Sequence, residues 1–318
     1  MSDQPMVLVQ AIENDPLLDM LGGIPHVTGA SLEAFGNDVA NAEAILHWSG
    51  SRDTLREIFL ASPRVRWVHS RNAGLDNTLF PELVESSAAL TNGSGVFSQS
   101  LGEFALTAIL YFAKDLPRML RNKAAHRWEQ FDIEEIAGQT VGIVGYGDIG
   151  RAVAWRAHAM GMIVLALKRH APAGGDPLIE RFYAPAQLLE MLALCDYVVV
   201  AAPLTGETRH MLSDAQFAAM KPSAVAINVG RGPVIDQKAL VRALVSKRIR
   251  GAGLDVFEHE PIPEDDPIWS LENVLVSPHT ADHTASWLND AMRFFKHQYD
   301  RFSRGEPLAN VVDKHLGY

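Results

Sequence analysis

The 318-residue sequence contains one cysteine, which excludes an intramolecular disulfide and a metal site built from several cysteines. Cys195 comes just before an apolar segment, so we expect a buried, unreactive thiol rather than a nucleophile. The sequence also lacks an apolar run of membrane-spanning length and a basic N-terminal segment followed by an apolar one. These absences predict no membrane span, no signal peptide and a cytoplasmic location.

Positive charge is also scarce. The 28 Lys and Arg residues are outnumbered by 38 Asp and Glu residues, so the net charge is −10. Such a balance argues against a general surface for nucleic acid or anionic membrane, although it leaves room for a local basic pocket. The apolar fraction of 47% is ordinary for a globular protein, and the length predicts about two domains.

The most informative segment is 141–150, where an apolar run meets three glycines with the spacing G-x-G-x-x-G. Apolar residues then recur at helical intervals, so the glycines mark the passage from a strand to a helix. Gly145 would permit a tight turn, Gly147 would let the backbone approach a pyrophosphate, and Gly150 would let the helix pack closely on the strand. This context favours a dinucleotide site over a glycine-rich turn of another kind.

Strand-like segments alternate with helical ones along the chain, which predicts parallel sheets covered by helices. In the first part, the strand-like segments are 6–12, 44–47, 65–69 and 88–91, and 51–61 has a helical pattern. Six more strands are expected at 141–145, 163–167, 197–201, 224–228, 251–255 and 274–277. Six strands with intervening helices make two βαβαβ halves, which is the doubly wound architecture.

Two long helices are also predicted. The first starts at Ser98 or Gln99, and its apolar face consists of Leu101, Ala105, Ala108, Phe112 and Leu116. It is too apolar to stand alone, so we expect it to pack against another domain or subunit. The second follows Thr284 and ends near Gly305, with a buried stripe of Leu288, Met292, Phe295, Tyr299 and Phe302.

Polar clusters follow three successive strands of the second part. Arg231 lies between two glycines, Glu260 lies in the segment 255–261, and His279 lies in the segment 277–280. Taken singly, these residues have ordinary alternatives: a loop ion pair, a solvated acid and a surface histidine. The carboxyl ends of parallel strands meet at one edge of a sheet, so the joint placement favours a site there.

These motifs, together with Ala73-Gly74-Leu75-Asp76 and the segment 203–208, resemble the D-isomer-specific 2-hydroxyacid dehydrogenase family in identity and order. The resemblance covers nearly the whole chain. It implies a Rossmann-type dinucleotide-binding domain at 97–282, inserted into a flavodoxin-like substrate domain that both chain ends form, 1–96 and 283–318. It also implies a homodimer that associates through the long apolar helix.

The resemblance implies that Arg231, Glu260 and His279 are catalytic. His279 would give a proton to the forming alkoxide, and Glu260 would orient the ring and favour its imidazolium form. Arg231 and the backbone of Ala73 and Gly74 would hold the substrate carboxylate. Relatives that oxidise formate carry glutamine in place of Glu260, so a 2-oxo or 2-hydroxy acid substrate is favoured. No metal is expected. The implied cofactor contacts are Gly145, Gly147, Asp148, Ile149, Gly150, Pro203, Thr208, Val229 and, at the nicotinamide, Asp255.

One departure concerns the cofactor. An NAD enzyme normally has an acid at the end of the second strand, which binds the ribose 2′-hydroxyl. Here that strand ends with Lys168 and Arg169, whose charges suit a 2′-phosphate. The sequence therefore predicts a preference for NADP over NAD. The alternative is an exposed basic strand end, with Asp176 reaching back from the next loop.

The predicted reaction is the reduction of a small 2-oxo acid, with glyoxylate/hydroxypyruvate reductases as the nearest resemblance. Arg71 is a candidate for binding a second anionic group on a larger substrate, and a solvated loop arginine is the alternative. Two other functions remain open: a cofactor-gated, corepressor-like binding scaffold, and a dehydrogenase of the same fold for another small anion. The complete set of Arg231, Glu260 and His279 favours an enzyme.

Overall fold

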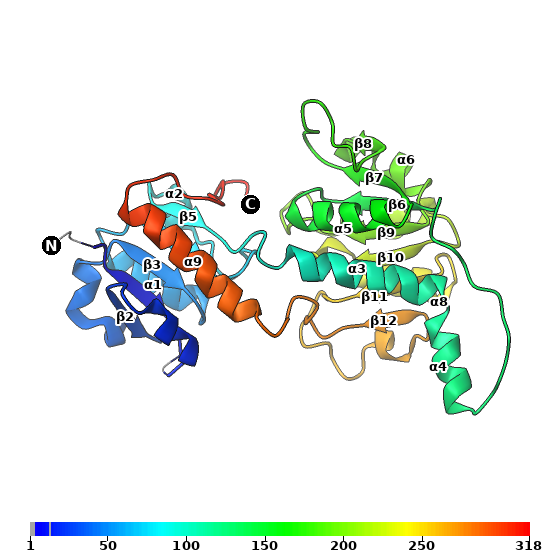
Figure 1. Ribbon diagram of the computed structural model, residues 1–318, viewed down its shortest axis with the longest axis horizontal. Coiled ribbons are helices and arrows are strands. Elements are labelled where there is room, and N and C mark those ends of the chain that lie inside the picture. Colours follow the sequence, from blue (N-terminus) through cyan, green and yellow to red (C-terminus); the bar gives the residue numbers. More distant parts are fainter. Residues whose placement is uncertain (1–3, 13) are drawn as a thin grey trace. The chain divides into compact units, whose positions relative to one another are not determined.

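The computed structural model describes residues 4–12 and 14–318, which form two compact units (Figure 1). The first unit comprises Met1–Phe97 and Ala285–Tyr318, and the second comprises Ser98–Thr284. The boundaries expected from the sequence, after residues 96 and 282, lie one and two residues before these limits. Both chain ends belong to the first unit, and the second unit is an insertion between them.

Within its described residues, the first unit has a five-stranded parallel sheet in the order β2-β1-β3-β4-β5. This is the strand order of flavodoxin, as predicted. The strands are β1 (Val7–Gln10), β2 (His26–Gly29), β3 (Ala44–His47), β4 (Trp67–Ser70) and β5 (Ala89–Thr91). The α-helices are α1 (Arg52–Ala61), α2 (Pro81–Glu85) and α9 (Trp287–Ser303).

The C-terminal segment completes the core of the first unit. Successive side chains of a strand point to opposite faces of the sheet. Accordingly Trp67 stacks on Phe295 of α9, with ring centroids 5.4 Å apart, whereas Val68 joins the apolar cluster on the other face. The hydroxyl of Tyr299 donates to the Pro5 carbonyl at 2.9 Å, and the amide of Val312 donates to Leu90. The two chain ends therefore fold as one unit.

The second unit, all of whose residues are described, has a seven-stranded parallel sheet in the order β12-β11-β10-β9-β6-β7-β8. Counted from β6, this is the Rossmann order 3-2-1-4-5-6 with one further strand. The strands are β6 (Thr140–Val144), β7 (Ile163–Leu167), β8 (Arg181–Tyr183), β9 (Tyr197–Val200), β10 (Val225–Asn228), β11 (Gly251–Leu254) and β12 (Val274–Val276).

Two strands were missing from the sequence prediction. The count of six strands for the second unit was wrong because β8 is a three-residue edge strand that begins with an exposed arginine. In the first unit β2 was missed, because three of its four residues are only half-buried and it lacks an apolar run. Both strands lie at sheet edges, where one side has no neighbour to enforce an apolar pattern.

Helices cover both faces of the second sheet (Figure 1). On one face, α3 (Ser98–Ala113) and α5 (Asp148–Ala159) pack against each other and against the sheet. On the other, α6 (Leu188–Leu192), α7 (Asp214–Ala219) and α8 (Gln237–Val245) enclose an apolar core. No helix in the described part of the chain has the length and apolar character needed to cross a membrane.

The long helix predicted from Ser98 to Leu116 is in fact two helices. After α3 ends at Ala113, Asp115 adopts a left-handed conformation (φ 47°) and its carboxylate caps α4 (Leu116–Ala124). Pro117 lies in the first turn of α4, where its missing N–H costs no hydrogen bond. Leu116 is therefore 36% exposed and does not extend the apolar face of α3.

Cys195 is fully buried, as expected, and its thiol donates to the Met191 carbonyl at 3.1 Å. Its sulfur fills the space above Gly142 on β6, because a Cβ placed there would come within 2.4 Å of it. Burial raises the pKa of the thiol to about 12, so Cys195 is a packing residue and not a nucleophile.

Candidate active site

The three glycines form the predicted turn between β6 and α5. Gly145 has a positive φ of 98°, and a Cβ there would come within 2.6 Å of the Ala202 backbone. A Cβ on Gly150 would come within 2.3 Å of the Gly145 carbonyl oxygen. Gly147 and Asp148 are exposed at the start of α5, and the first turn of a helix is where backbone N–H groups can bind an anion.

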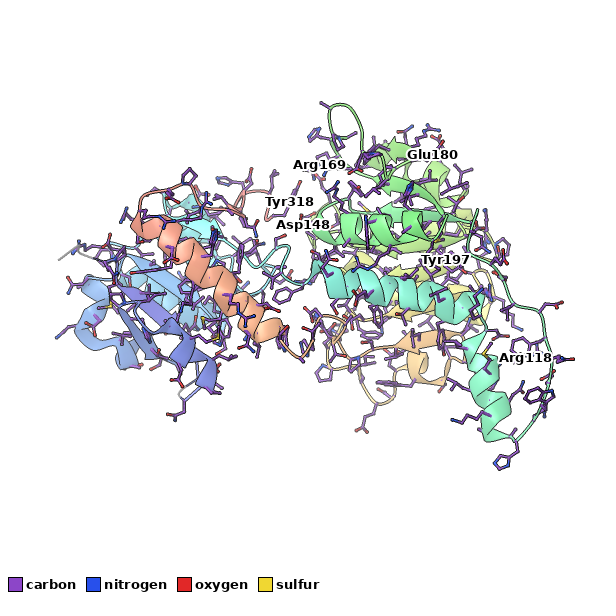
Figure 2. The ribbon with its side chains drawn as sticks, in the orientation of Figure 1. Arg118, Asp148, Arg169, Glu180, Tyr197 and Tyr318 are labelled. Carbon is purple, nitrogen blue, oxygen red and sulfur yellow. The ribbon has the colours of Figure 1, made fainter. Side chains whose placement is uncertain are left out.

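Both basic residues at the end of β7 are engaged in the structure. The Lys168 ammonium donates to the Tyr146 carbonyl, within the glycine turn, at 2.7 Å. Arg169 pairs with Glu207 at 2.6 Å, and the Glu207 side chain is 74% exposed. Figure 2 shows Asp148 at the start of α5 and Arg169 in the loop after β7. Lys168 is thus tied directly to the glycine turn.

Asp176 reaches back to the same turn from the loop between β7 and β8. Its Oδ2 accepts hydrogen bonds from the Tyr146 hydroxyl at 2.9 Å and from Arg151 at 3.0 Å. The backbone N–H of Leu178, followed by Arg151 and Tyr146, lowers the pKa of this carboxyl despite the opposing effect of burial. Asp176 thus contacts Tyr146, Arg151 and the Leu178 amide, whereas Lys168 contacts Tyr146 and Arg169 pairs with Glu207.

Two further loops leave the same edge of the sheet. In the loop after β9, the Thr208 hydroxyl donates to the Pro203 carbonyl at 2.6 Å and accepts from the Thr205 amide at 2.8 Å. After β10, the buried Val229 continues the parallel ladder by donating to Val200. These contacts fix the backbone of both predicted cofactor segments close to the strand ends.

His279 and Glu260 form a direct pair. The Nδ1 of His279 lies 2.7 Å from Oε2 of Glu260, and the side chains are 43% and 35% exposed. The other carboxylate oxygen accepts from the Phe257 amide at 2.8 Å, so Glu260 is held at both oxygens. None of the residues that the structure describes hydrogen-bonds to Nε2 of His279. The pair thus presents one ring nitrogen of an oriented imidazole to solvent.

Asp255 holds the loop that carries His279. It is 1% exposed, and its Oδ1 accepts three hydrogen bonds: from the Ser277 hydroxyl at 2.6 Å and from the Thr280 and Ala281 amides at 3.0 Å each. The sequence prediction assigned Asp255 a contact with the nicotinamide, which stays a prediction. Its role as an anchor was not foreseen, because spacing alone does not reveal which backbone amides a buried carboxylate will meet.

Arg231 lies in the neighbouring loop, which Asn228 shapes. The Asn228 side chain accepts from the Gly230 amide and donates to the Arg231 carbonyl, both at 3.1 Å. A Cβ on Gly232 would come within 1.8 Å of the Phe257 carbonyl, so this loop packs directly on the one that leads to Glu260. No role was predicted for Asn228 from the sequence. A polar residue that ends a buried strand was the available signal.

The loop of Ala73 and Gly74 belongs to the first unit. The Ala73 carbonyl accepts from the buried Asn92 side chain at 2.6 Å, which fixes the loop. Within the described part of the chain, neither the Ala73 amide nor the Gly74 amide donates to another residue. Two adjacent amides that are fixed in place and unused can bind a carboxylate.

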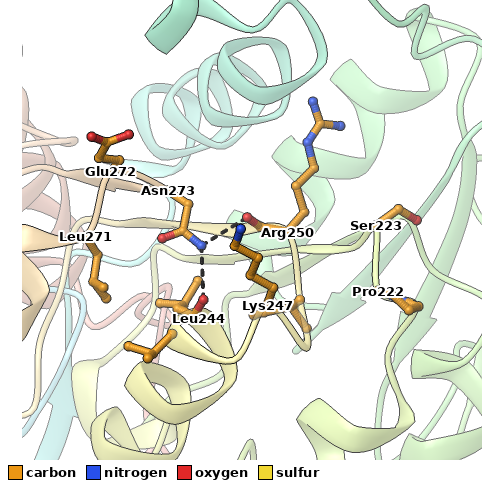
Figure 3. Close-up of a pocket in the computed structure, with 10 residues that line it drawn as sticks. Pro222, Ser223, Leu244, Lys247, Arg250, Leu271, Glu272 and Asn273 are labelled. Atoms are coloured by element: carbon orange, nitrogen blue, oxygen red, sulfur yellow. Dashed lines mark hydrogen bonds between the residues drawn. The ribbon is translucent and has the colours of Figure 1, made fainter.

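A surface hollow of about 610 Å³ lies elsewhere, at the amino ends of β10, β11 and β12 (Figure 3). Asn273 bridges its wall by donating to the Leu244 and Arg250 carbonyls. The hollow contains none of the residues predicted for the site, which cluster at the carboxyl ends of the strands. Ligands of open α/β sheets bind at the carboxyl ends, so we do not assign the hollow to the site.

Comparison with known proteins agrees with this geometry. The chain is 35% identical to a glyoxylate reductase of Korarchaeum cryptofilum over 266 residues, which span 82% of this chain and 80% of that protein. It superimposes with a TM-score of 0.85 on a D-isomer specific 2-hydroxyacid dehydrogenase from Xanthobacter autotrophicus in complex with NADPH and MES, at 30% identity and 99% coverage of both chains.

A second solved structure has a TM-score of 0.84 and is 27% identical, covering 99% of this chain and all of the other. It is an NADPH-dependent glyoxylate/hydroxypyruvate reductase from Sinorhizobium meliloti in complex with NADP and sulfate. Residues 106–281 match the family described as D-isomer specific 2-hydroxyacid dehydrogenase, NAD binding domain. The chain therefore belongs to the D-isomer-specific 2-hydroxyacid dehydrogenases, a family of NAD(P)-dependent oxidoreductases.

Proposed function

We propose that the protein reduces a small 2-oxo acid to the 2-hydroxy acid with NADPH as the preferred cofactor. The observation that carries this proposal is the His279–Glu260 pair, held at the same sheet edge as the glycine turn. Arg231, in the loop packed against the one that leads to Glu260, supplies the cation that a 2-oxo acid requires. The scaffold therefore presents a proton donor, an anion-binding group and a dinucleotide turn together.

The proposed chemistry divides between these residues. A bound nicotinamide supplies the hydride that reduces the carbonyl carbon. Nε2 of His279 gives a proton to the oxygen as it becomes an alkoxide, while Glu260 stabilises the imidazolium form and fixes its orientation. Arg231 binds the carboxylate and stabilises charge on the carbonyl oxygen, and the Ala73 and Gly74 amides hold the same carboxylate.

The proposed cofactor site uses the glycine turn for the pyrophosphate and the end of β7 for the ribose. Gly145, Gly147, Asp148, Ile149 and Gly150 would surround the pyrophosphate. Lys168 and Arg169 would bind a 2′-phosphate, Arg169 by leaving Glu207. Pro203, Thr208, Val229 and Asp255 would line the remainder. In this proposal the second unit binds the dinucleotide and the first unit supplies the substrate loop.

Glyoxylate and hydroxypyruvate are the substrates we test first, because relatives of this chain carry those names. The experiment measures kcat/KM for these acids, and for pyruvate and 2-oxobutyrate, with NADPH and with NADH. We expect turnover on at least one of these acids and a lower KM for NADPH than for NADH. A clear preference for NADH would contradict the cofactor assignment. Tight NADPH binding without turnover on any 2-oxo acid would instead favour a cofactor-gated scaffold.

We also infer a homodimer, formed through the second unit. Large apolar side chains are exposed along α4 and the segment that follows it: Met119 (40%), Leu120 (61%), Trp128 (95%) and Ile133 (51%). Exposed apolar groups concentrated in one segment mark an association surface, and a second copy of this chain is the partner that the family resemblance implies.

A cytoplasmic location stays a prediction.

A further inference from the structure

Arg71, at the carboxyl end of β4, contacts two indole rings. Its guanidinium carbon lies 5.1 Å from the ring centroid of Trp48 and 5.5 Å from that of Trp287. Trp48 is buried and donates from Nε1 to Asp15 at 2.8 Å, and Trp287 contacts Phe97 edge-on. Each ring is therefore held by its own neighbours, and together they restrict the directions that the guanidinium can take.

The backbone of Arg71 is equally constrained. Its amide donates to the His47 carbonyl at 3.1 Å, which continues the ladder between β3 and β4. Its carbonyl oxygen would lie 2.2 Å from a Cβ on Gly93, so the backbone segments touch there. Arg71 is thus pre-positioned at both backbone and side chain, and it remains half-buried rather than enclosed.

The neighbouring histidine adds no competing positive charge. Burial lowers the pKa of His47 below its ordinary value, and the charge of Arg71 adds to this shift while a hydrogen bond with the Gly50 carbonyl opposes it, so His47 is mainly neutral at neutral pH. Arg71 is therefore the cation that this corner of the first unit presents next to the Ala73–Gly74 loop. An indole stacks on the face of a guanidinium, whereas the N–H groups project from its edge. Nε of Arg71 is buried, so the terminal N–H groups of this half-buried side chain are the ones that can pair with a carboxylate.

We propose that Arg71 binds a second carboxylate of the substrate, which makes 2-oxo dicarboxylic acids the preferred substrate class. This rests on the proposed function, in which the Ala73 and Gly74 amides hold the carboxylate next to the reacting carbonyl. Arg71 precedes Ala73 by two residues in the same loop, so it is placed to meet the far end of such a molecule. A monocarboxylic acid of equal length has no group to meet it.

The test compares acids of matched length, oxaloacetate with 2-oxobutyrate and 2-oxoglutarate with 2-oxovalerate, each with saturating NADPH. A charge-assisted pair contributes about 1.5–3 kcal/mol, so we expect the wild type to favour each diacid by about tenfold or more in kcat/KM. Arg71→Gln should remove this preference by raising KM for the diacids, with the monoacids changed by less than about threefold. Arg64→Gln, which removes an exposed arginine of the same unit, is the matched control.

The possible results are separable. If the wild type has a kcat/KM for the diacid that is equal to or below that for the matched monoacid, the role of Arg71 is overturned. An unchanged ratio of these two values in Arg71→Gln overturns it as well. An equal loss on diacids and monoacids also overturns it, because Arg71 would then support the carboxylate that all substrates share. If the wild type reduces no 2-oxo acid at all, the proposed function itself fails. Unchanged NADPH affinity and melting temperature show that Arg71→Gln is folded.

Discussion

His279, the proposed proton donor, is the residue whose loss should lower turnover most. General acid catalysis contributes about 10²–10⁴-fold, so we expect His279→Gln to lower kcat by a factor in that range. The Kd for NADPH should stay within about twofold, because no contact of the glycine turn involves His279. His259 is an exposed histidine in the Glu260 segment, and His259→Gln is the matched control. Near-wild-type turnover in His279→Gln would refute the assignment.

The Glu260 carboxylate is held at both of its oxygens by protein groups. Phe257 holds one of its oxygens and His279 holds the other, so the carboxylate links the loop after β11 to the loop after β12. Asp255 makes a second link through three hydrogen bonds to one oxygen. Asp255 therefore fixes the loop that carries His279 and Glu260 orients its imidazole, so the proposed proton donor is held in place by the protein itself.

At the scale of elements, Gly150 and Gly147 are required in the glycine turn for different reasons: Gly150 for helix packing and Gly147 for the proposed approach of the cofactor. At Gly150 an added Cβ would strike the Gly145 carbonyl, so Gly150→Ala must push α5 away from β6 and should cost about 1–3 kcal/mol of stability. At Gly147 an added Cβ would meet nothing within 4 Å, so Gly147→Ala should fold normally. Its methyl group would nevertheless occupy the space that the proposed cofactor site assigns to the pyrophosphate.

We therefore expect the two variants to differ in the midpoint of urea unfolding and in the Kd for NADPH. Gly147→Ala should keep the unfolding midpoint of the wild type and raise the Kd for NADPH by about tenfold or more, which is a loss of roughly 1.4 kcal/mol. Gly150→Ala should lower the midpoint. If Gly147→Ala binds NADPH like the wild type, the pyrophosphate does not approach the turn there.

The sequence predicted those elements whose environment is uniform. Central strands such as β9 and β10 are buried on both faces, so their apolar runs were recognised with only small errors at the ends. The edge strands β2 and β8 lack that environment and were missed. The break between α3 and α4 depends on the left-handed conformation of Asp115, a single-residue event that helical periodicity does not register.

The candidate site was predictable to the extent that its residues end strands. Arg231, Glu260 and His279 follow β10, β11 and β12, and parallel topology brings those loops to one edge. Residue spacing could not reveal that Asp176 would contact Tyr146 and Arg151, because Asp176 lies in an irregular loop whose path is not set by a helical or strand period. The anchoring roles of Asn228 and Asp255 were hidden for the same reason: they depend on tertiary contacts between loops.

For the molecule as a whole, the insertion separates the two tasks that the proposed reaction requires. The first unit has its own core, closed by α9, and contains the Ala73–Gly74 loop and Arg71. The second unit has a different core and contains the glycine turn and His279. Each unit is therefore stabilised independently of the groups it presents, and loops at the strand ends can vary without loss of the fold.

The exposed apolar side chains of α4 and the segment that follows it predict that the protein is a homodimer in solution. Exposure of Trp128 and Leu120 to water is unfavourable, and burial against a second copy removes that cost. Sedimentation equilibrium should therefore give twice the chain mass of 34.8 kDa at micromolar concentration.

Replacing both residues, with Leu120→Asp and Trp128→Ser, should shift the population to monomer, because the charge and the lost indole both oppose burial. Trp269→Ser, at a tryptophan of the same unit that is 53% exposed, is the control and should stay dimeric. A wild type that sediments at 34.8 kDa at every concentration would contradict the homodimer.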